Sequence, residues 1–190
     1  MPEVWIIILF HQLLFQAMFV TKNIILYMRI GKQIRGDNKE ATISIIFFTL
    51  FIGVSVGISI LNNSFGKAHL LNDFLAMVIG LVILILNLFI SLASLISMKD
   101  SWRIGVLENQ KTELVTSGIY RFTRNAYFVS YLLMFVAYTV LLQNVILLGL
   151  SVLGFVFIHK MIIKEEIYLH SVHGVTYTQY KTKVPRYLIL

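Results

Sequence analysis

Long apolar segments dominate the pattern of this chain. Five segments carry few charges: residues 4–20, which can continue as a helix to residue 30, then 41–61, 70–98, 126–142 and 145–163. About 20 helical residues are needed to cross the roughly 30 Å of hydrocarbon in a bilayer. The fourth segment is short, and the third is long enough to tilt or to project into the cytoplasm. The pattern predicts an all-α, polytopic membrane bundle of about five transmembrane helices.

Polar residues gather at the two ends of the last pair of apolar segments. Gln143 and Asn144 alone separate that pair, and so short a link predicts an antiparallel helical hairpin. The polar stretches 99–124 and 164–186 would lie at the two feet of this hairpin. Gly118 and Gly174 punctuate them, and Pro185 marks the end of any helix in the tail. We predict one domain, 1–190, with three N-terminal spans in 1–98 and the polar loop, hairpin and tail in 99–190.

Basic residues predict the orientation of these helices. The chain has 16 Lys and Arg against 9 Asp and Glu, and of the basic residues only Lys67 falls in a loop on the opposite side from the rest. The positive-inside rule therefore places the loop after the first span, the 99–124 loop and the C-terminus in the cytoplasm, and the N-terminus outside. Because the net charge of +7 is explained by topology and lipid headgroups, we expect no nucleic-acid partner.

Composition excludes several classes of function. Hydrophobic residues make up 58% of the chain, too many for a soluble domain. The absence of cysteine excludes disulfides, thiolate metal sites and cysteine nucleophiles. Glu166, His170 and His173 have a spacing that could hold a metal, but no His-Glu-x-x-His motif accompanies them, so we predict no metal. The sequence also has neither a phosphate-binding loop nor a G-x-G-x-x-G motif, which excludes a soluble Rossmann-type domain.

Some polar and aromatic residues are expected to have structural roles. His11 and Asn87 lie within spans, where hydrogen bonding between helices is the usual role of a polar side chain. We expect His159, at the inner end of the fifth segment, to be a buried hydrogen-bonding histidine. Tyr177 and Tyr180 are expected to anchor the tail at the membrane surface.

The second half of the chain carries a series of motifs in a fixed order. The run Leu-Val-x-x-Gly-Ile-Tyr occupies residues 114–120, and an Arg-Asn-Ala-Tyr-Phe box follows at 124–128. After the hairpin come Glu-Glu-x-x-Leu at 165–169, Gly-x-x-Tyr-x-x-Tyr at 174–180 and Val-Pro-Arg at 184–186. From residue 98 to 186, this order resembles the isoprenylcysteine carboxyl methyltransferase and phospholipid methyltransferase superfamily of integral membrane enzymes.

The resemblance implies methyl transfer from S-adenosylmethionine to a lipophilic or lipid-modified acceptor at the cytoplasmic membrane face. Methylation of an oxygen, as by isoprenylcysteine carboxyl methyltransferases, is the favoured form. By position, the cofactor-binding residues are Leu114, Val115, Tyr120, Asn125, Ala126, Tyr127, Phe128 and Glu165. The same comparison makes Arg124 and Glu166 the candidate catalytic residues. Arg103 and Lys160 are candidates for binding the substrate.

The departures from the family pattern concern the acceptor more than the cofactor. Ala126 replaces the proline of the box, and Met161 stands where prenylcysteine methyltransferases have an arginine that holds the substrate carboxylate. Methionine cannot hold a carboxylate, so the acceptor stays open. Two alternatives also remain: an NADPH-dependent membrane enzyme like the sterol reductases, and a non-catalytic membrane subunit with a decayed site.

Overall fold

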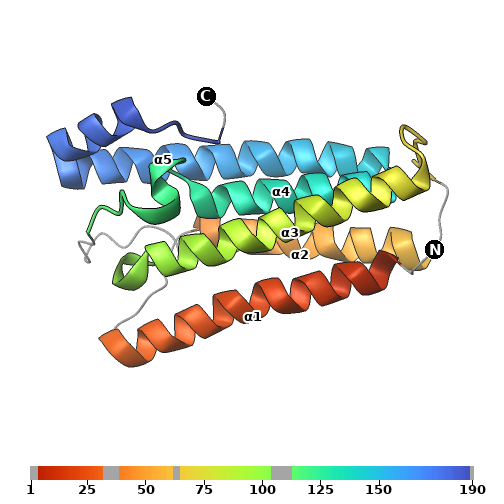
Figure 1. Ribbon diagram of the computed structural model, residues 1–190, viewed down its shortest axis with the longest axis horizontal. Coiled ribbons are helices and arrows are strands. Elements are labelled where there is room, and N and C mark those ends of the chain that lie inside the picture. Colours follow the sequence, from red (N-terminus) through yellow and green to blue (C-terminus); the bar gives the residue numbers. More distant parts are fainter. Residues whose placement is uncertain (1–3, 32–38, 62–64, 104–112, 189–190) are drawn as a thin grey trace.

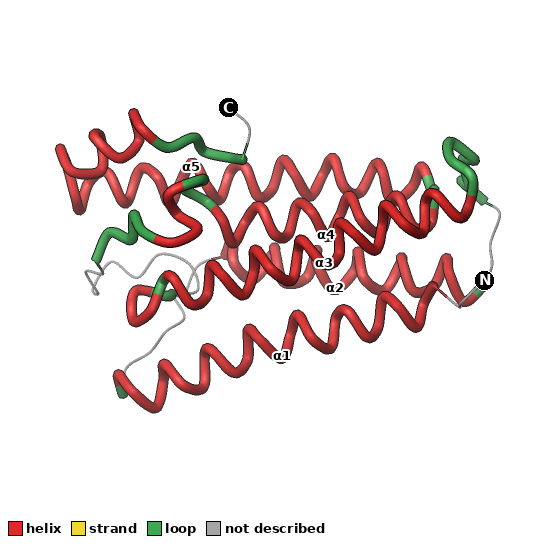
Figure 2. The backbone as a smooth tube through the Cα atoms, viewed as in Figure 1, coloured by secondary structure: helices red, strands yellow, loops and turns green. Residues whose placement is uncertain are grey.

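The fold is a bundle of long helices. The computed structural model describes residues 4–31, 39–61, 65–103 and 113–188. Its helices are α1 (Val4–Ile30), α2 (Lys39–Ile60), α3 (Asp73–Ser97), α4 (Ala126–Leu142) and α5 (Val145–Lys183), with 3-10 turns at Lys99–Ser101 and Gly118–Arg121. Within these ranges the chain forms no β-strand (Figure 2). The predicted all-α membrane bundle is confirmed.

The helices lie side by side along the long axis of the molecule (Figure 1). α4 packs between α3 and α5, and α1 and α2 lie along one side of this group. The short link at Gln143 and Asn144 makes α4 and α5 the predicted antiparallel hairpin, with Gln143 in the left-handed conformation. The 113–125 loop and the C-terminal tail lie together at the end of the bundle opposite the N-terminus.

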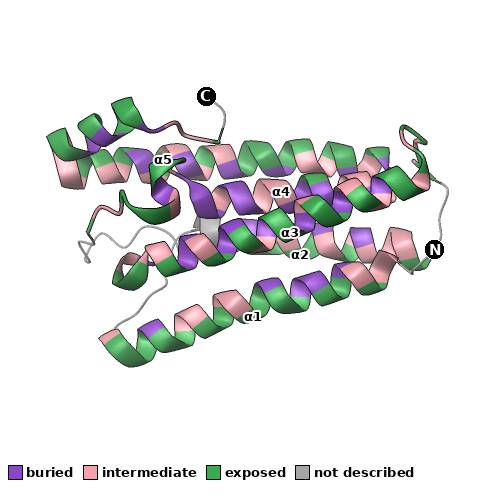
Figure 3. Cartoon of the chain, viewed as in Figure 1, coloured by how far each residue is buried: buried purple, intermediate pink, exposed green. Residues whose placement is uncertain are grey.

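Helix length and surface composition agree with a bilayer environment. α1, α2, α3 and α5 each contain a stretch long and apolar enough to cross a membrane. α4 has 17 residues, or about 25 Å of helix, as the short fourth segment predicted. It is also well buried by its neighbours, whereas the outer faces of α1 and α3 expose large apolar side chains such as Phe10 and Phe89 (Figure 3). Such faces suit contact with lipid.

A buried polar network joins three of the helices. His11 of α1 makes two hydrogen bonds of 2.8 Å through its ring nitrogens, one with Asn87 Oδ1 of α3 and one with the Tyr138 hydroxyl of α4. Asn87 also donates to the main-chain carbonyl of Ser130. The predicted hydrogen bonding of His11 and Asn87 between helices is confirmed, and it fixes α1 against the α3–α4 pair.

The fifth helix differs from the prediction. The apolar pattern ends near residue 163, but α5 continues to Lys183 as a polar helix. Gly174, with φ +49° and ψ −121°, breaks it, and the last turns fold back (Figure 1). Tyr177 and Tyr180 lie in this folded-back part and are only 1% and 8% exposed. The expectation that they anchor the tail at the membrane surface was therefore wrong, because they pack against the 113–125 loop instead.

Candidate functional site

The two polar stretches meet at the foot of the α4–α5 hairpin, as the sequence predicted. Leu114 packs against Tyr177, Tyr180 and Val184 of the folded-back tail. Tyr120 packs against the first residue of α4 and is only 6% exposed. The 113–125 loop is thus held between the end of α3 and the tail, so residues far apart in sequence form one site.

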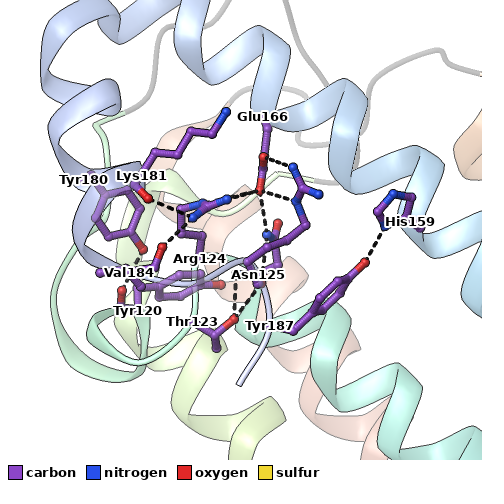
Figure 4. A network of polar contacts seen from close by, with 11 residues as sticks. Tyr120, Thr123, Arg124, Asn125, His159, Glu166, Tyr180, Lys181, Val184 and Tyr187 are labelled. Atoms are coloured by element: carbon purple, nitrogen blue, oxygen red, sulfur yellow. Dashed lines mark hydrogen bonds and ion pairs between the residues drawn. The ribbon is translucent and has the colours of Figure 1, made fainter. Parts of the chain in front are cut away.

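Glu166 is the centre of a buried cluster of ion pairs in this site (Figure 4). Its Oε1 atom accepts hydrogen bonds from Arg124 Nη2 at 3.0 Å, Arg186 Nε at 3.1 Å and Asn125 Nδ2 at 3.2 Å. Its Oε2 atom accepts one from Arg186 Nη2 at 2.9 Å. Burial alone would raise the pKa of this carboxyl, but the two guanidinium groups and the amide outweigh burial and hold the pKa below its ordinary value.

The same segment of loop also binds the main chain of the tail. We call residues 184–187 the C-terminal strap. The Thr123 hydroxyl donates to the Arg186 carbonyl at 2.9 Å, and the Arg124 main-chain N–H donates to the Pro185 carbonyl at 3.0 Å. Arg124 Nη1 donates to the Val184 carbonyl as well. The strap is therefore fixed to the loop through its backbone, and the side chains of Arg186 and Tyr187 fix it to α5.

Tyr187 ends the strap against α5. Its hydroxyl forms a hydrogen bond of 2.7 Å with His159 Nδ1, and the two rings stack. His159 was predicted to be a buried hydrogen-bonding histidine. The hydrogen bond is present, but the side chain is only half-buried.

Glu165 has surroundings very different from those of its neighbour Glu166. Its side chain is half-buried near Tyr120 and Tyr177. Among the described residues it has neither a hydrogen bond nor an ion pair. Burial, and then the charge of Glu166, raise the pKa of Glu165 to about 7. Two adjacent carboxyl groups are thereby given opposite pKa shifts, an arrangement common at functional sites.

A cavity of about 480 Å³ opens between the ends of α1 and α3 and the start of the 113–125 loop, and its wall includes neither Glu165 nor Glu166. It is lined by Ile30, Ser97–Ser101, Arg103 and Glu113–Ser117, so it includes the predicted residues Leu114, Val115 and Arg103. Arg103 is held in its wall because Nη1 donates to the carbonyls of Asp100 and Trp102, at 2.8 and 2.6 Å. Leu114 lines this cavity and also packs against Tyr177, Tyr180 and Val184 of the tail. The volume is in the range of small-molecule sites.

The four residues at the start of α4 point in different directions. Asn125 reaches Glu166, whereas Ala126 is fully buried against Tyr120. Tyr127 packs against Trp102, and Phe128 contacts the core of the bundle. Successive residues of a helix are turned by about 100°, so they cannot all face one ligand. Of these four residues, Asn125 is the one that joins Arg124 in contact with Glu166.

Lys160, a predicted substrate-binding residue, and Met161, a departure from the family pattern, both lie away from the Glu166 cluster. Lys160 is exposed on α5 and belongs neither to the cavity wall nor to the Glu166 cluster. Met161 faces α2, where its sulfur accepts a hydrogen bond of 2.8 Å from the Ser44 hydroxyl.

The residues that sequence reasoning missed are those of the strap. The motif at 184–186 was part of the family pattern, but it gave no role to Arg186 or Tyr187. Their contacts with Glu166 and His159 depend on the reversal at Gly174, which no local pattern predicts.

Comparison with known proteins agrees with this arrangement. A profile of the phospholipid methyltransferase family matches residues 75–176, just over half of the 190-residue chain. The match runs from the start of α3 through the hairpin and past Gly174. No curated protein and no solved structure matches the chain.

Proposed function

We propose, since this chain belongs to the phospholipid methyltransferase family, that it transfers a methyl group from S-adenosylmethionine to a lipophilic acceptor. The acceptor would come laterally from the bilayer and the cofactor from the cytoplasm. One structural observation supports this proposal above the others. Motifs that are far apart in the sequence come together at the foot of the α4–α5 hairpin, and Leu114 and Val115 of the first motif also line a cavity of about 480 Å³.

The residues present suit a ligand that is partly polar and partly apolar. Glu165 offers a carboxylate without a partner among the described residues, which could accept hydrogen bonds from ribose hydroxyls or an ammonium group. Leu114 and Val115 supply apolar contacts in the cavity. Tyr120 and Asn125 complete the part of the proposed cofactor site that lies next to the carboxylates. Ala126, Tyr127 and Phe128 would support this site through the packing of α4.

The reaction needs positioning more than acid–base chemistry. When bound, S-adenosylmethionine would supply an electrophilic methyl group, and S-adenosylhomocysteine would leave. The protein must align the acceptor with that methyl group and keep water out. A carboxylate acceptor is already ionised at neutral pH, whereas an alcohol or an amine needs a base, for which Glu165, with a pKa of about 7, is suited.

We propose O-methylation, as in isoprenylcysteine carboxyl methyltransferases, as the leading form of the reaction. Arg103 is placed to meet a polar group of the acceptor because it lines the cavity. Lys160 could meet a headgroup only outside that cavity. Arg124 and Glu166 bind each other and the tail. We therefore propose that they act by holding the 113–125 loop, α5 and the tail together around the cofactor site.

Cofactor titration tests the proposal against its rivals. Purified protein in detergent should bind S-adenosylhomocysteine saturably and should not bind NADPH. Glu165→Ala and Asn125→Ala should each weaken S-adenosylhomocysteine binding. The control Asp73→Asn removes a carboxylate at the opposite end of α3 from the cavity and should change binding little. Binding of NADPH alone would favour the reductase. If neither compound bound, the chain would be a non-catalytic subunit, and unchanged binding by both variants would refute the site.

A further inference from the structure

Glu166 has two arginine partners, and they differ in origin. Arg124 comes from the loop directly before α4, and its side chain is 7% exposed. Arg186 comes from the C-terminal strap, ten residues beyond the end of the family match, and its side chain is 29% exposed. The strap therefore adds a second cation to a carboxylate that is already paired.

Arg186 approaches the carboxylate at two points. Nε and Nη2 donate to Oε1 and Oε2, at 3.1 and 2.9 Å. Such a two-point contact fixes the plane of a carboxylate as well as its position. Arg124 and Asn125 bind the same carboxylate only through Oε1. Arg186 is thus the partner that fixes the orientation of Glu166.

The orientation of Glu166 matters because Asn125 is bound to it and Glu165 is its neighbour on α5. Asn125 Nδ2 donates to Glu166 Oε1 and to the Arg186 carbonyl, each at 3.2 Å, so both hydrogen bonds of this nitrogen go to the Glu166–Arg186 pair. Glu165 is the next residue of α5, and its direction is set by the rotation of that helix. The contact between Arg186 and Glu166 anchors α5 at this turn, where Glu165 is half-buried near Tyr120 and Tyr177.

We propose that Arg186 is a positioning residue, which acts through Glu166 to hold Asn125 and Glu165 in the arrangement that binds the cofactor. This inference rests on the proposed function. Arg186 itself need not touch the ligand. Its contribution is the two-point contact from the strap, which a lysine could not reproduce because lysine presents a single ammonium group.

A double-mutant cycle tests this role by titration with S-adenosylhomocysteine. Arg186→Gln should weaken binding about tenfold, as expected for losing hydrogen bonds to a charged group. Lys183→Gln removes the same charge from an exposed position three residues away and should leave binding unchanged. Glu166→Gln should also weaken binding. In that background, Arg186→Gln should have little further effect, because the two residues act together.

The outcomes separate this inference from the proposed function. If the unchanged chain binds no S-adenosylhomocysteine, the proposed function fails and the inference fails with it. If the unchanged chain binds and Arg186→Gln binds as Lys183→Gln does, only the inference fails. Additive effects of Arg186→Gln and Glu166→Gln would also refute it, because a merely structural strap would act independently. Should Arg186→Gln not fold, Arg186→Lys gives the same test, with an expected loss of about threefold.

Discussion

The Tyr180 hydroxyl donates a hydrogen bond of 2.6 Å to the main-chain carbonyl of Tyr120, 60 residues earlier in the chain. This contact joins the folded-back end of α5 to the loop that precedes α4. Both residues are buried, so the carbonyl would have no access to water without its partner. The tail is therefore part of the site's framework, although it follows the last apolar segment.

Tyr180→Phe should lower the stability of the protein. The ring would keep its packing, but the buried Tyr120 carbonyl would lose its donor, at a cost of about 1–2 kcal/mol. Thermal unfolding in detergent would measure the change. Tyr27→Phe is the matched control, because Tyr27 is 61% exposed, and it should unfold like the unchanged protein. Equal unfolding temperatures for the two variants would show that the tail does not depend on this bond.

Gly174→Ala should also be destabilising, for a reason of backbone conformation. Gly174 has φ +49°, a left-handed value that costs an alanine about 1 kcal/mol or more. Gly149→Ala is the control. Neither glycine has another atom within 4 Å of an added Cβ, but Gly149 lies in regular helix. Thermal unfolding should show a lower stability for Gly174→Ala and a slightly higher stability for Gly149→Ala. Equal changes in stability would contradict the reversal of the chain at Gly174.

The stability of the protein should depend on pH through Glu165. Burial and the charge of Glu166 raise its pKa from 4.5 to about 7 in the folded protein. The folded state then binds a proton more tightly than the unfolded state, so this contribution favours folding at low pH and is lost as pH rises from about 4.5 to 7. Glu165→Gln should therefore be more stable than the unchanged protein at pH 8, by about 1–3 kcal/mol.

Denaturation at several pH values would measure this difference. The two proteins should converge below about pH 4, where Glu165 is mostly protonated in both the folded and the unfolded state. Glu166 acts in the opposite sense, because folding lowers its pKa. Its contribution to the stability of the folded protein is therefore lost as the pH falls below the ordinary pKa of a glutamate. A gap between Glu165→Gln and the unchanged protein that stays constant from pH 5 to 8 would refute the raised pKa.

The sequence predicted the membrane helices well because hydrophobic segments end where the chain leaves hydrocarbon. The fourth segment, 126–142, coincides with α4, and the link at Gln143 and Asn144 forms the expected hairpin. The polar partners His11 and Asn87 were also recognisable, because a polar side chain within a span needs a hydrogen bond.

The tail could not be predicted from the same signals. Gly174 marks a break, but a glycine does not tell in which direction the chain continues. The burial of Tyr177 and the pairing of Arg186 with Glu166 both follow from that direction. Motif position identified Glu165 and Glu166 as a pair, but their opposite pKa shifts arise from contacts made in three dimensions.

Transfer of a labelled methyl group tests the central claim most directly. Purified protein would be incubated with methyl-labelled S-adenosylmethionine and a membrane lipid extract, and the labelled product would be identified by mass spectrometry. We predict label in a lipophilic product from the unchanged protein, and a strong loss of label with Glu165→Ala but not with Lys183→Gln. Equal labelling with and without the protein would contradict the assignment of this chain as a membrane methyltransferase enzyme.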